Sequence, residues 1–414
     1  MPTAPDWPSR GAAPLKQTLV RHQESIRRET HPDSGAQVTQ LTSAALIHHH
    51  IYPEAPVFTP DSRRFVYSRF ASLDQPRQYW ICDLATHELQ PLTAASEATS
   101  VHGPVVTPDG RWLVYVSAPD SADGGPTDRL EIQRMPLDEP GAPSEVVASV
   151  EGFRRPYPLG TISPDGRYYA TCALRLSPSG GTPIAGILVA DLARGEIGCV
   201  HEGHEIFNAH MQFEPGAGED LLIQHNRGGV LDREGTIVRL VGDEGATLYL
   251  IDRAGGNLRR LNIGRPYSRP IQGHQVWLGP TGRALSTLVR RPDDDPDEGD
   301  LVSIGPGDER PREVARGWAF DHLAVTPDGR YFVSEVKPDA EIVVGSVATG
   351  RVRVLCASGA SLGRPQYTHT HPFFSPDARH VLFNSDRTGL GQIYAATVPL
   401  GFLAGLDGSG GAGD

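Results

Sequence analysis

The sequence predicts an all-β protein, a seven-bladed β-propeller with four-stranded blades. The first observation is a repeat: two or three apolar residues, a Pro-Asp-Gly-like turn, a basic residue and a second apolar run recur seven times. The second is the spacing of the turn prolines, 47 to 65 residues, which matches one four-stranded propeller blade. The third is a lone turn and strand near the N-terminus, which supplies a strand that the last repeat lacks.

The chemistry of the turn explains the repeat. Proline sets φ at the first turn position, aspartate bonds back to the backbone, and glycine accepts a positive φ. The apolar runs on either side are therefore expected to form strands A and B of each blade. The seven copies are residues 56–69, 104–117, 160–173, 211–225, 276–289, 323–336 and 372–385.

Strands C and D follow most copies as a strand, a turn and a second strand, as in residues 79–93, 186–200 and 247–261. The last copy is followed by one strand only, within residues 391–399. The turn and strand at 30–42 are expected to complete this blade, because closing the ring removes exposed strand edges.

We therefore expect a single propeller domain over residues 1–414. Its ordered core is expected at about residues 15–400, followed by a Gly-rich tail, 401–414, without fixed structure.

Composition excludes several classes of protein. The net charge of −12 argues against sequence-independent nucleic-acid binding. No apolar run approaches the roughly 18 residues that span a bilayer, and the N-terminus lacks the pattern of a signal peptide, so we expect a cytoplasmic protein. The four cysteines are widely spaced and are expected as buried thiols rather than disulfides or zinc ligands: Cys82, Cys172, Cys199 and Cys356. The oligomeric state is not determined by these features.

Histidines recur at equivalent positions of the repeats. Because strand A of each blade lines the central channel, these positions are expected to converge near one rim. The members, five to seven residues before a turn proline, are His210, His274, His322, His369 and His371. Blade two offers His102, and the run His48–His50 precedes blade one.

The densest cluster is the element Gln366-x-x-His369-x-His371. On an extended segment His369 and His371 point to the same side. Two imidazoles, an amide oxygen and a third imidazole from a neighbouring blade can bind a divalent metal. The alternative is a pair satisfied by channel water and backbone, and for His322 a structural hydrogen-bonding role stays open.

Other motifs carry no chemistry of their own. The Gly/Ser loops at 177–181 and 358–363 lack the elbow of a serine hydrolase, and phosphate-binding glycine motifs are absent. The acidic run at 293–298 is expected to be a solvated loop. The insertion at 226–246, with three arginines, is expected either to cover the channel mouth or to form an ordinary exposed loop.

Residues 48–61, 273–277, 321–333 and 369–399 together resemble the oligogalacturonate lyases, cytoplasmic seven-bladed propellers that complete pectin breakdown. The resemblance covers nearly the whole chain. It implies a Mn²⁺-type divalent ion held by four residues, with a further histidine as the Brønsted base. The implied ligands are His322, Gln366, His369 and His371, and the implied base is His274 in Gly-His-Gln-Val-Trp.

The resemblance also implies an assisting arginine near Thr247, where this sequence has none. Arg227, Arg265 and Arg269 are alternatives that spacing does not separate. We further expect His50, His210 and Arg227 to contact substrate.

The function implied by the resemblance is β-elimination on short, acidic uronate oligosaccharides. The C5 proton of a galacturonate unit is α to a carboxylate, so a metal on that carboxylate would stabilise the developing charge, and a neutral imidazole is suited to take the proton. Two alternatives are kept: a related lyase for another uronide, and a non-catalytic propeller that binds a protein or sugar.

Overall fold

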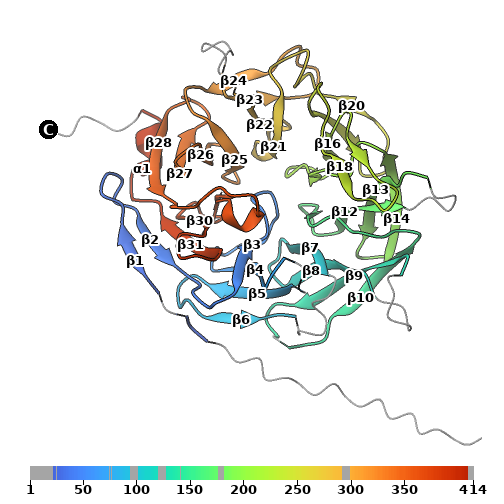
Figure 1. Ribbon diagram of the computed structural model, residues 1–414, viewed down its shortest axis with the longest axis horizontal. Coiled ribbons are helices and arrows are strands. Elements are labelled where there is room, and N and C mark those ends of the chain that lie inside the picture. Colours follow the sequence, from blue (N-terminus) through green and yellow to red (C-terminus); the bar gives the residue numbers. More distant parts are fainter. Residues whose placement is uncertain are drawn as a thin grey trace, which may run out of the picture.

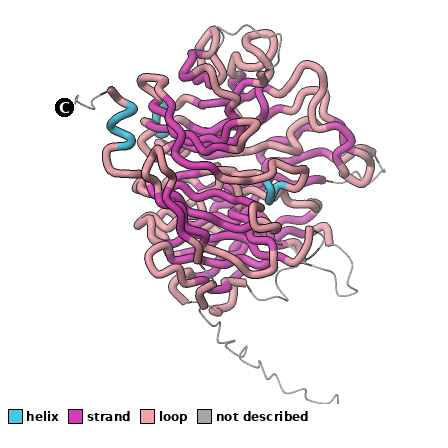
Figure 2. The backbone as a smooth tube through the Cα atoms, turned by 60° about the vertical axis from the view of Figure 1, so that its left-hand side comes forward, coloured by secondary structure: helices cyan, strands magenta, loops and turns pink. Residues whose placement is uncertain are grey.

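Seven antiparallel sheets surround a central axis in the computed structural model (Figure 1). The structure describes residues 22–408 apart from 25, 74, 76, 94–100, 120–126, 140, 176–180 and 291–298. Strand runs through the whole body, and helix occurs only in short pieces (Figure 2). The predicted all-β, seven-bladed propeller is confirmed.

Six blades are built from consecutive stretches of chain. Blade one contains β3 (Ile47–His50), β4 (Arg64–Phe70), β5 (Gln78–Asp83) and β6 (Leu89–Pro91). Blade two contains β7 (Val101–Val106), β8 (Trp112–Ser117), β9 (Arg129–Pro136) and β10 (Glu145–Glu151). Blade three contains β11 (Gly160–Ile162), β12 (Tyr168–Arg175), β13 (Ile184–Asp191) and β14 (Glu196–Gly203).

The remaining blades follow the same order, with one hairpin added to blade four. Blade four contains β15 (Gln212–Phe213), β16 (Asp220–His225), β19 (Thr247–Asp252) and β20 (Arg259–Arg260), with the inserted hairpin β17 (Val230–Leu231) and β18 (Ile237–Arg239). Blade five contains β21 (Ile271–Trp277), β22 (Ala284–Leu288), β23 (Leu301–Ile304) and β24 (Arg312–Ala315). Blade six contains β25 (Phe320–Val325), β26 (Tyr331–Val336), β27 (Glu341–Ser346) and β28 (Val352–Ala357).

The seventh blade joins the two ends of the chain. It contains β29 (Phe373–Phe374), β30 (His380–Ser385) and β31 (Gln392–Thr397), and its next strand is β2 (Gln37–Gln40). Strand β2 pairs antiparallel with β31, with Val38 opposite Ala396. A fifth strand, β1 (Arg28–Thr30), lies outside β2. The expected closure by residues 30–42 is therefore seen, and it ties the ring together by backbone hydrogen bonds.

The repeated turns pack against one another around one end of the channel. In blade two, Asp109 Oδ1 accepts hydrogen bonds from the Thr107 hydroxyl at 2.5 Å and the Arg111 amide at 3.0 Å. Gly110 has a φ of 71°, and a Cβ there would come within 2.7 Å of Pro60 Cδ in blade one. Glycine is required at this position both by the backbone angle and by the neighbouring turn.

Six of the seven turn prolines line a cavity of about 520 Å³ at this end of the channel, which we call the proline mouth. They are Pro60, Pro108, Pro164, Pro215, Pro327 and Pro376.

The core lies between blades, because the middle strands are buried on both faces. Strands β16 and β19, for example, each have four consecutive buried residues. All four cysteines are free thiols, as predicted; Cys82, Cys172 and Cys356 are buried and Cys199 is half-buried.

The prediction of a tail without structure from residue 401 is wrong as far as residue 408. Helix α1 (Phe402–Leu406) packs Phe402 and Leu406 into the core, since residues four apart share one helical face. Asp407 then accepts a hydrogen bond from the Tyr331 hydroxyl at 2.5 Å. Residues 1–21, 409–414 and the acidic run up to 298 lie outside the described residues. None of the described helices is long and apolar enough to cross a membrane.

Candidate metal centre and cavity

The predicted histidines gather at a second part of the channel, which shares no lining residue with the proline mouth. A cavity of about 310 Å³ opens there, and we call it the histidine cavity. This volume is at the lower limit of pockets that hold small organic ligands, roughly 300–1,000 Å³. Its lining includes His49, Tyr52, Arg77, His210, His274, His322 and Gln366.

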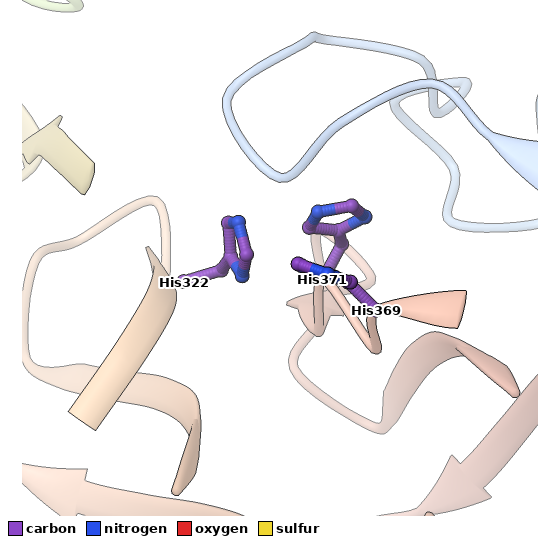
Figure 3. Close-up of side chains that lie close together, drawn as sticks. All are labelled: His322, His369 and His371. Carbon is purple, nitrogen blue, oxygen red and sulfur yellow. The ribbon is translucent and has the colours of Figure 1, made fainter. Parts of the chain in front are cut away.

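Three of the predicted ligands converge beside this cavity. His322 lies on β25, and His369 and His371 lie between the short 3-10 helix η2 (Gln366–Thr368) and β29. One ring nitrogen from each histidine lies within 4.8 Å of the other two. The ring centroids of His322 and His371 are 4.1 Å apart, and Figure 3 shows the three rings facing a common space.

The hydrogen bonds of these rings fit a metal. His369 Nε2 donates to the Gly363 carbonyl at 2.7 Å, which leaves Nδ1 as the nitrogen with a free lone pair. That atom and both nitrogens of His371 are buried and have no hydrogen-bond partner. Each such atom costs free energy unless something coordinates it. A divalent ion would satisfy these atoms, so this donor set suits a metal of the Mn²⁺ or Zn²⁺ type.

The backbone at His371 supports the same interpretation. His371 is fully buried and has a φ of 46°, in the left-handed region that non-glycine residues rarely adopt. Such strain is typical of functional sites, where the surroundings hold a side chain in one orientation.

Two rings of the cluster, those of His322 and His371, are neutral imidazoles. Burial lowers the pKa of His322 to about 3, with further lowering by His369. Burial and then the repulsion of His322 lower the pKa of His371 well below its usual value. Because a metal binds the deprotonated imidazole, these rings are already in the form that coordinates.

Two buried carboxyl groups, those of Glu335 and Asp321, lie behind the rings. Glu335 on β26 is fully buried, and its Oε1 lies 2.5 Å from His322 Nδ1. Burial and the charge of Asp321 raise the pKa of Glu335 to about 8. A partner of this kind fixes the orientation of a ligating histidine. The sequence did contain a signal for it, a single acidic residue within the apolar strand 331–336.

His274 lies directly beside the cluster. Its ring stacks on His322 with centroids 4.0 Å apart, and its Nδ1 lies 3.0 Å from Asp321 Oδ1. The angles are not those of a hydrogen bond, so the contact is electrostatic in this conformation. Burial raises the pKa of Asp321, but His274, His322 and Lys337 outweigh it and hold that pKa below its usual range. Burial also lowers the pKa of His274.

Irregularities in the inner strands direct these histidines. The register of β21 with β22 shifts between Ile271 and Gln275, and that of β25 with β26 shifts between Phe320 and Leu323. His274 and His322 lie inside these two irregular stretches. An extra residue in a strand turns a side chain away from the regular alternation, which explains how the inner strands can present histidines to the channel.

Two further predictions concern Gln366 and His210. Gln366 lines the cavity together with His322, and its role as a fourth ligand stays a prediction. His210 also lines the cavity, and its Nδ1 lies 3.0 Å from Glu54 Oε1. The ring of Tyr52, which the sequence did not single out, lies between His210 and His371, at 5.3 and 4.9 Å from their centroids.

The structure does not bring His50 to the cavity. Its ring packs on Phe373 at 4.7 Å and its Nε2 donates to the Thr370 carbonyl at 3.2 Å. Because side chains alternate along β3, the neighbouring His49 lines the cavity instead. Of the His48–His50 run, the structure therefore brings His49, and not the predicted His50, to the cavity lining.

Arg227 is not brought to the cavity either. Its Nε and both terminal nitrogens donate to three carbonyls, those of Gly245, Glu244 and Arg265, at 2.7 to 2.9 Å. The guanidinium therefore holds the ends of the insertion together.

The other two arginine candidates also have partners outside the cavity. Arg265 donates to the Asp243 carbonyl, and Arg269 is paired with Asp300 at 3.2 Å. Thr247, at the expected arginine position, donates to the Ile263 carbonyl at 2.7 Å. From the insertion, Leu240 reaches the cavity lining. Arg77, a residue of blade one that the sequence did not single out, lines it as well.

The fold and site together define a seven-bladed propeller with a candidate metal centre at one end of its channel. No protein-family model matches the chain. Two curated relatives do: an oligogalacturonate lyase of Dickeya dadantii, 24% identical with 91% of this chain and 97% of the relative covered, and an oligogalacturonide lyase of Pectobacterium atrosepticum, 23% identical with 88% and 94% covered.

Two solved structures share the fold. An oligogalacturonate lyase in complex with manganese has a TM-score of 0.71 at 21% identity, covering 92% of this chain and 98% of that one. An oligogalacturonate lyase from Vibrio parahaemolyticus has a TM-score of 0.71 at 19% identity, covering 93% and 99%. The resemblance seen in the sequence is thereby confirmed, and the chain is a relative of the oligogalacturonate lyases.

Proposed function

We propose that this protein is a metal-dependent lyase that cleaves short oligogalacturonides by β-elimination, a late step of pectin degradation, with Mn²⁺ as the ion. The observation that carries the proposal is the cluster of His322, His369 and His371, whose buried nitrogens lack partners, directly beside His274. The relatives named above support the reaction class, and one of them is a manganese complex.

The ion would be held by the three histidines and by the amide oxygen of Gln366. When bound, it would supply a Lewis acid for the carboxylate of the reacting sugar, which makes the C5 proton more acidic. Glu335 holds the His322 ring from behind through the 2.5 Å contact with Nδ1. The neutral state of His322 and His371 leaves these two rings ready for the ion without a proton to displace.

His274 is proposed as the base that takes the C5 proton. Its Nδ1 side faces the Asp321 carboxylate, so Nε2 is the nitrogen left for substrate. Asp321 stabilises the imidazolium that forms when the proton arrives, because it stays ionised at neutral pH. Departure of the O4 group then leaves a 4,5-unsaturated sugar.

The test is turnover of di- and trigalacturonate, followed as ultraviolet absorbance of the unsaturated product. We expect EDTA to abolish turnover and Mn²⁺ to restore it. His274→Ala should lower kcat by about 10²- to 10⁴-fold, the usual range for losing a general base. His380→Ala, in the turn region of blade seven, is the matched control and should be unaffected. Absence of turnover by the metal-loaded protein on every uronide would favour a non-catalytic binding propeller.

A second candidate is a related lyase for a different uronide. Thr247 occupies the position where the resemblance implies an arginine, and its hydroxyl is engaged with a backbone carbonyl. A site with a different distribution of positive charge selects a different arrangement of carboxylates. A screen that compares galacturonides with oligomers of other uronic acids distinguishes the two candidates by their kcat/KM values.

A further inference from the structure

We propose that Arg77 binds a second carboxylate of the substrate, that of the sugar next to the one held at the metal centre. The inference rests on the proposed function and names the residue that recognises the carboxylate of the sugar that does not react. Two observations support it: Arg77 lines the cavity, and the other candidate arginines are engaged in hydrogen bonds or an ion pair elsewhere.

Arg77 stands in blade one, just before β5, in the connection from β4. It lines the histidine cavity together with His49, His274, His322 and Gln366. Among the described residues of that lining, it is the only lysine or arginine. It therefore brings the one permanent positive charge found among the described lining residues, in a chain whose net charge is −12.

The guanidinium is held by an aromatic ring rather than by an acid. It lies over the Phe70 ring at 4.9 Å from the centroid. In the described part of the chain, no ion pair joins it to a carboxylate. A guanidinium over an aromatic face keeps the N–H donors at its edge free, and they can meet a planar carboxylate with two parallel hydrogen bonds.

The charge acts on the histidines around it. Burial and then Arg77 lower the pKa of His102 to about 4. Burial, His50 and then Arg77 lower the pKa of His49. An uncompensated positive charge among neutral imidazoles in a concave site favours an anionic ligand.

The three arginines that sequence spacing left open do not provide this charge. Arg227 and Arg265 donate to backbone carbonyls of the insertion, and Arg269 is paired with Asp300. Arg77 differs from them because it lines the cavity and, in the described part of the chain, has no ion pair with a carboxylate. Arg77 also differs in position from the arginine that the resemblance implies. Arg77 comes from blade one, whereas the implied arginine would come from blade five.

The placement also separates two carboxylate sites. The metal cluster belongs to blades six and seven, and Arg77 belongs to blade one. The ring of His49 stands 5.6 Å from His371 and lines a small cavity together with Arg77. The metal centre and Arg77 are therefore two positions on different blades, each suited to one carboxylate. A dimer carries two carboxylates, so dimers and longer oligomers would use both.

The experiment compares Arg77→Gln and Arg77→Lys with wild type on digalacturonate and on its derivative esterified on the carboxylate away from the reacting sugar. Loss of a charge-assisted bidentate contact is expected to raise KM by roughly 10- to 100-fold with kcat changed less. Arg77→Lys should recover part of this loss, since it keeps the charge but not the fork. Arg379→Gln, an exposed arginine in the turn of blade seven, is the control.

The esterified substrate gives the deciding comparison. Wild type should lose affinity for it to about the level of Arg77→Gln, and the variant should scarcely distinguish the two substrates. Mn²⁺ binding, measured by calorimetry, should be the same in all four proteins. A KM for Arg77→Gln within two-fold of wild type overturns this inference and leaves the lyase function standing. No turnover by wild type overturns both. If Arg77→Gln does not fold, the esterified substrate and Arg77→Lys decide alone.

Discussion

The two ends of the propeller channel are made from the same seven repeats and have opposite chemistry. At the proline mouth, six blades present the same residue, a turn proline, and the space between them is mostly apolar. At the histidine cavity, blades one, four, five and six each present a histidine, and blade seven adds Gln366. The backbone that carries these residues to the histidine cavity differs from blade to blade.

The difference shows where the repeat is constrained. The turns of neighbouring blades touch, as Gly110 does Pro60, so a change in one turn displaces the next. The inner strands at the other end include irregular stretches, and the histidines there carry buried polar atoms without a hydrogen-bond partner, which a bound ion or water would satisfy. We infer that the proline mouth serves stability and the histidine cavity serves chemistry.

The strongest test of this division is His371→Ala. We expect the variant to lose uronide turnover and to bind Mn²⁺ much more weakly, by more than the roughly 10- to 100-fold that losing an outer partner costs. Wild type should gain thermal stability when Mn²⁺ is added, since an ion that binds only the folded state stabilises it. The variant should not respond to Mn²⁺. An equal rise in melting temperature for both proteins would place the metal elsewhere.

Glu335→Gln tests the layer behind the ligands. The amide keeps the shape of the side chain but removes the ionisable carboxyl group next to His322 Nδ1. We expect Mn²⁺ affinity to fall by about 10- to 100-fold while kcat at saturating Mn²⁺ is largely retained. Calorimetric titration with Mn²⁺ measures this directly, and Glu341→Gln on the neighbouring strand β27 is the control. Unchanged affinity would mean that Glu335 has a packing role only.

Much of this division can be read from the sequence. The blade repeat follows from turn chemistry, which acts within a few residues, and the partner strand of the last blade follows from the need to close the ring. The convergence of His322, His369 and His371 follows from their equivalent positions, because a repeat carries information about space as well as about sequence. These predictions all use one feature, the alignment of the seven turns.

The predictions that failed depend on details that this alignment does not contain. His50 and His49 differ by one residue, and which of them faces the cavity is set by the pairing of β3 with β4. The position of Arg77 depends on a connection between strands, where the repeat gives no register. The order of residues 401–408 depends on Phe402 and Leu406 meeting the core, a contact distant in sequence.

At the proline mouth, Trp277→Phe should affect stability and leave the chemistry intact. The indole Nε1 donates to the buried Gln212 carbonyl at 3.0 Å, and the ring lines this mouth. Removing the donor leaves that carbonyl without this bond and costs about 1–3 kcal/mol of unfolding free energy. Denaturant unfolding measures the loss, and the KM for digalacturonate should stay the same. A large change in KM would show that the two ends of the channel are coupled.

The smallest expected effect concerns His48, which lies beside the cavity histidines in sequence but is fully buried in blade one. Burial lowers its pKa to about 4, from an ordinary value of 6.5. Between these two values the unfolded chain binds a proton that the folded protein does not, so stability falls as the pH is lowered through this window. Below pH 4 the folded protein binds the proton too, and the loss stops growing.

His48→Leu removes this titration and should flatten the profile. Between pH 7 and pH 5, the metal-free wild type should lose about 2 kcal/mol of unfolding free energy that the variant keeps. The measurement is urea unfolding of both proteins at a series of pH values. Parallel profiles would contradict the assignment of His48 as a neutral histidine of the core. The division of the β3 histidines into core and cavity residues would then be wrong. A flatter profile with unchanged Mn²⁺ affinity places the boundary between His48 and His49.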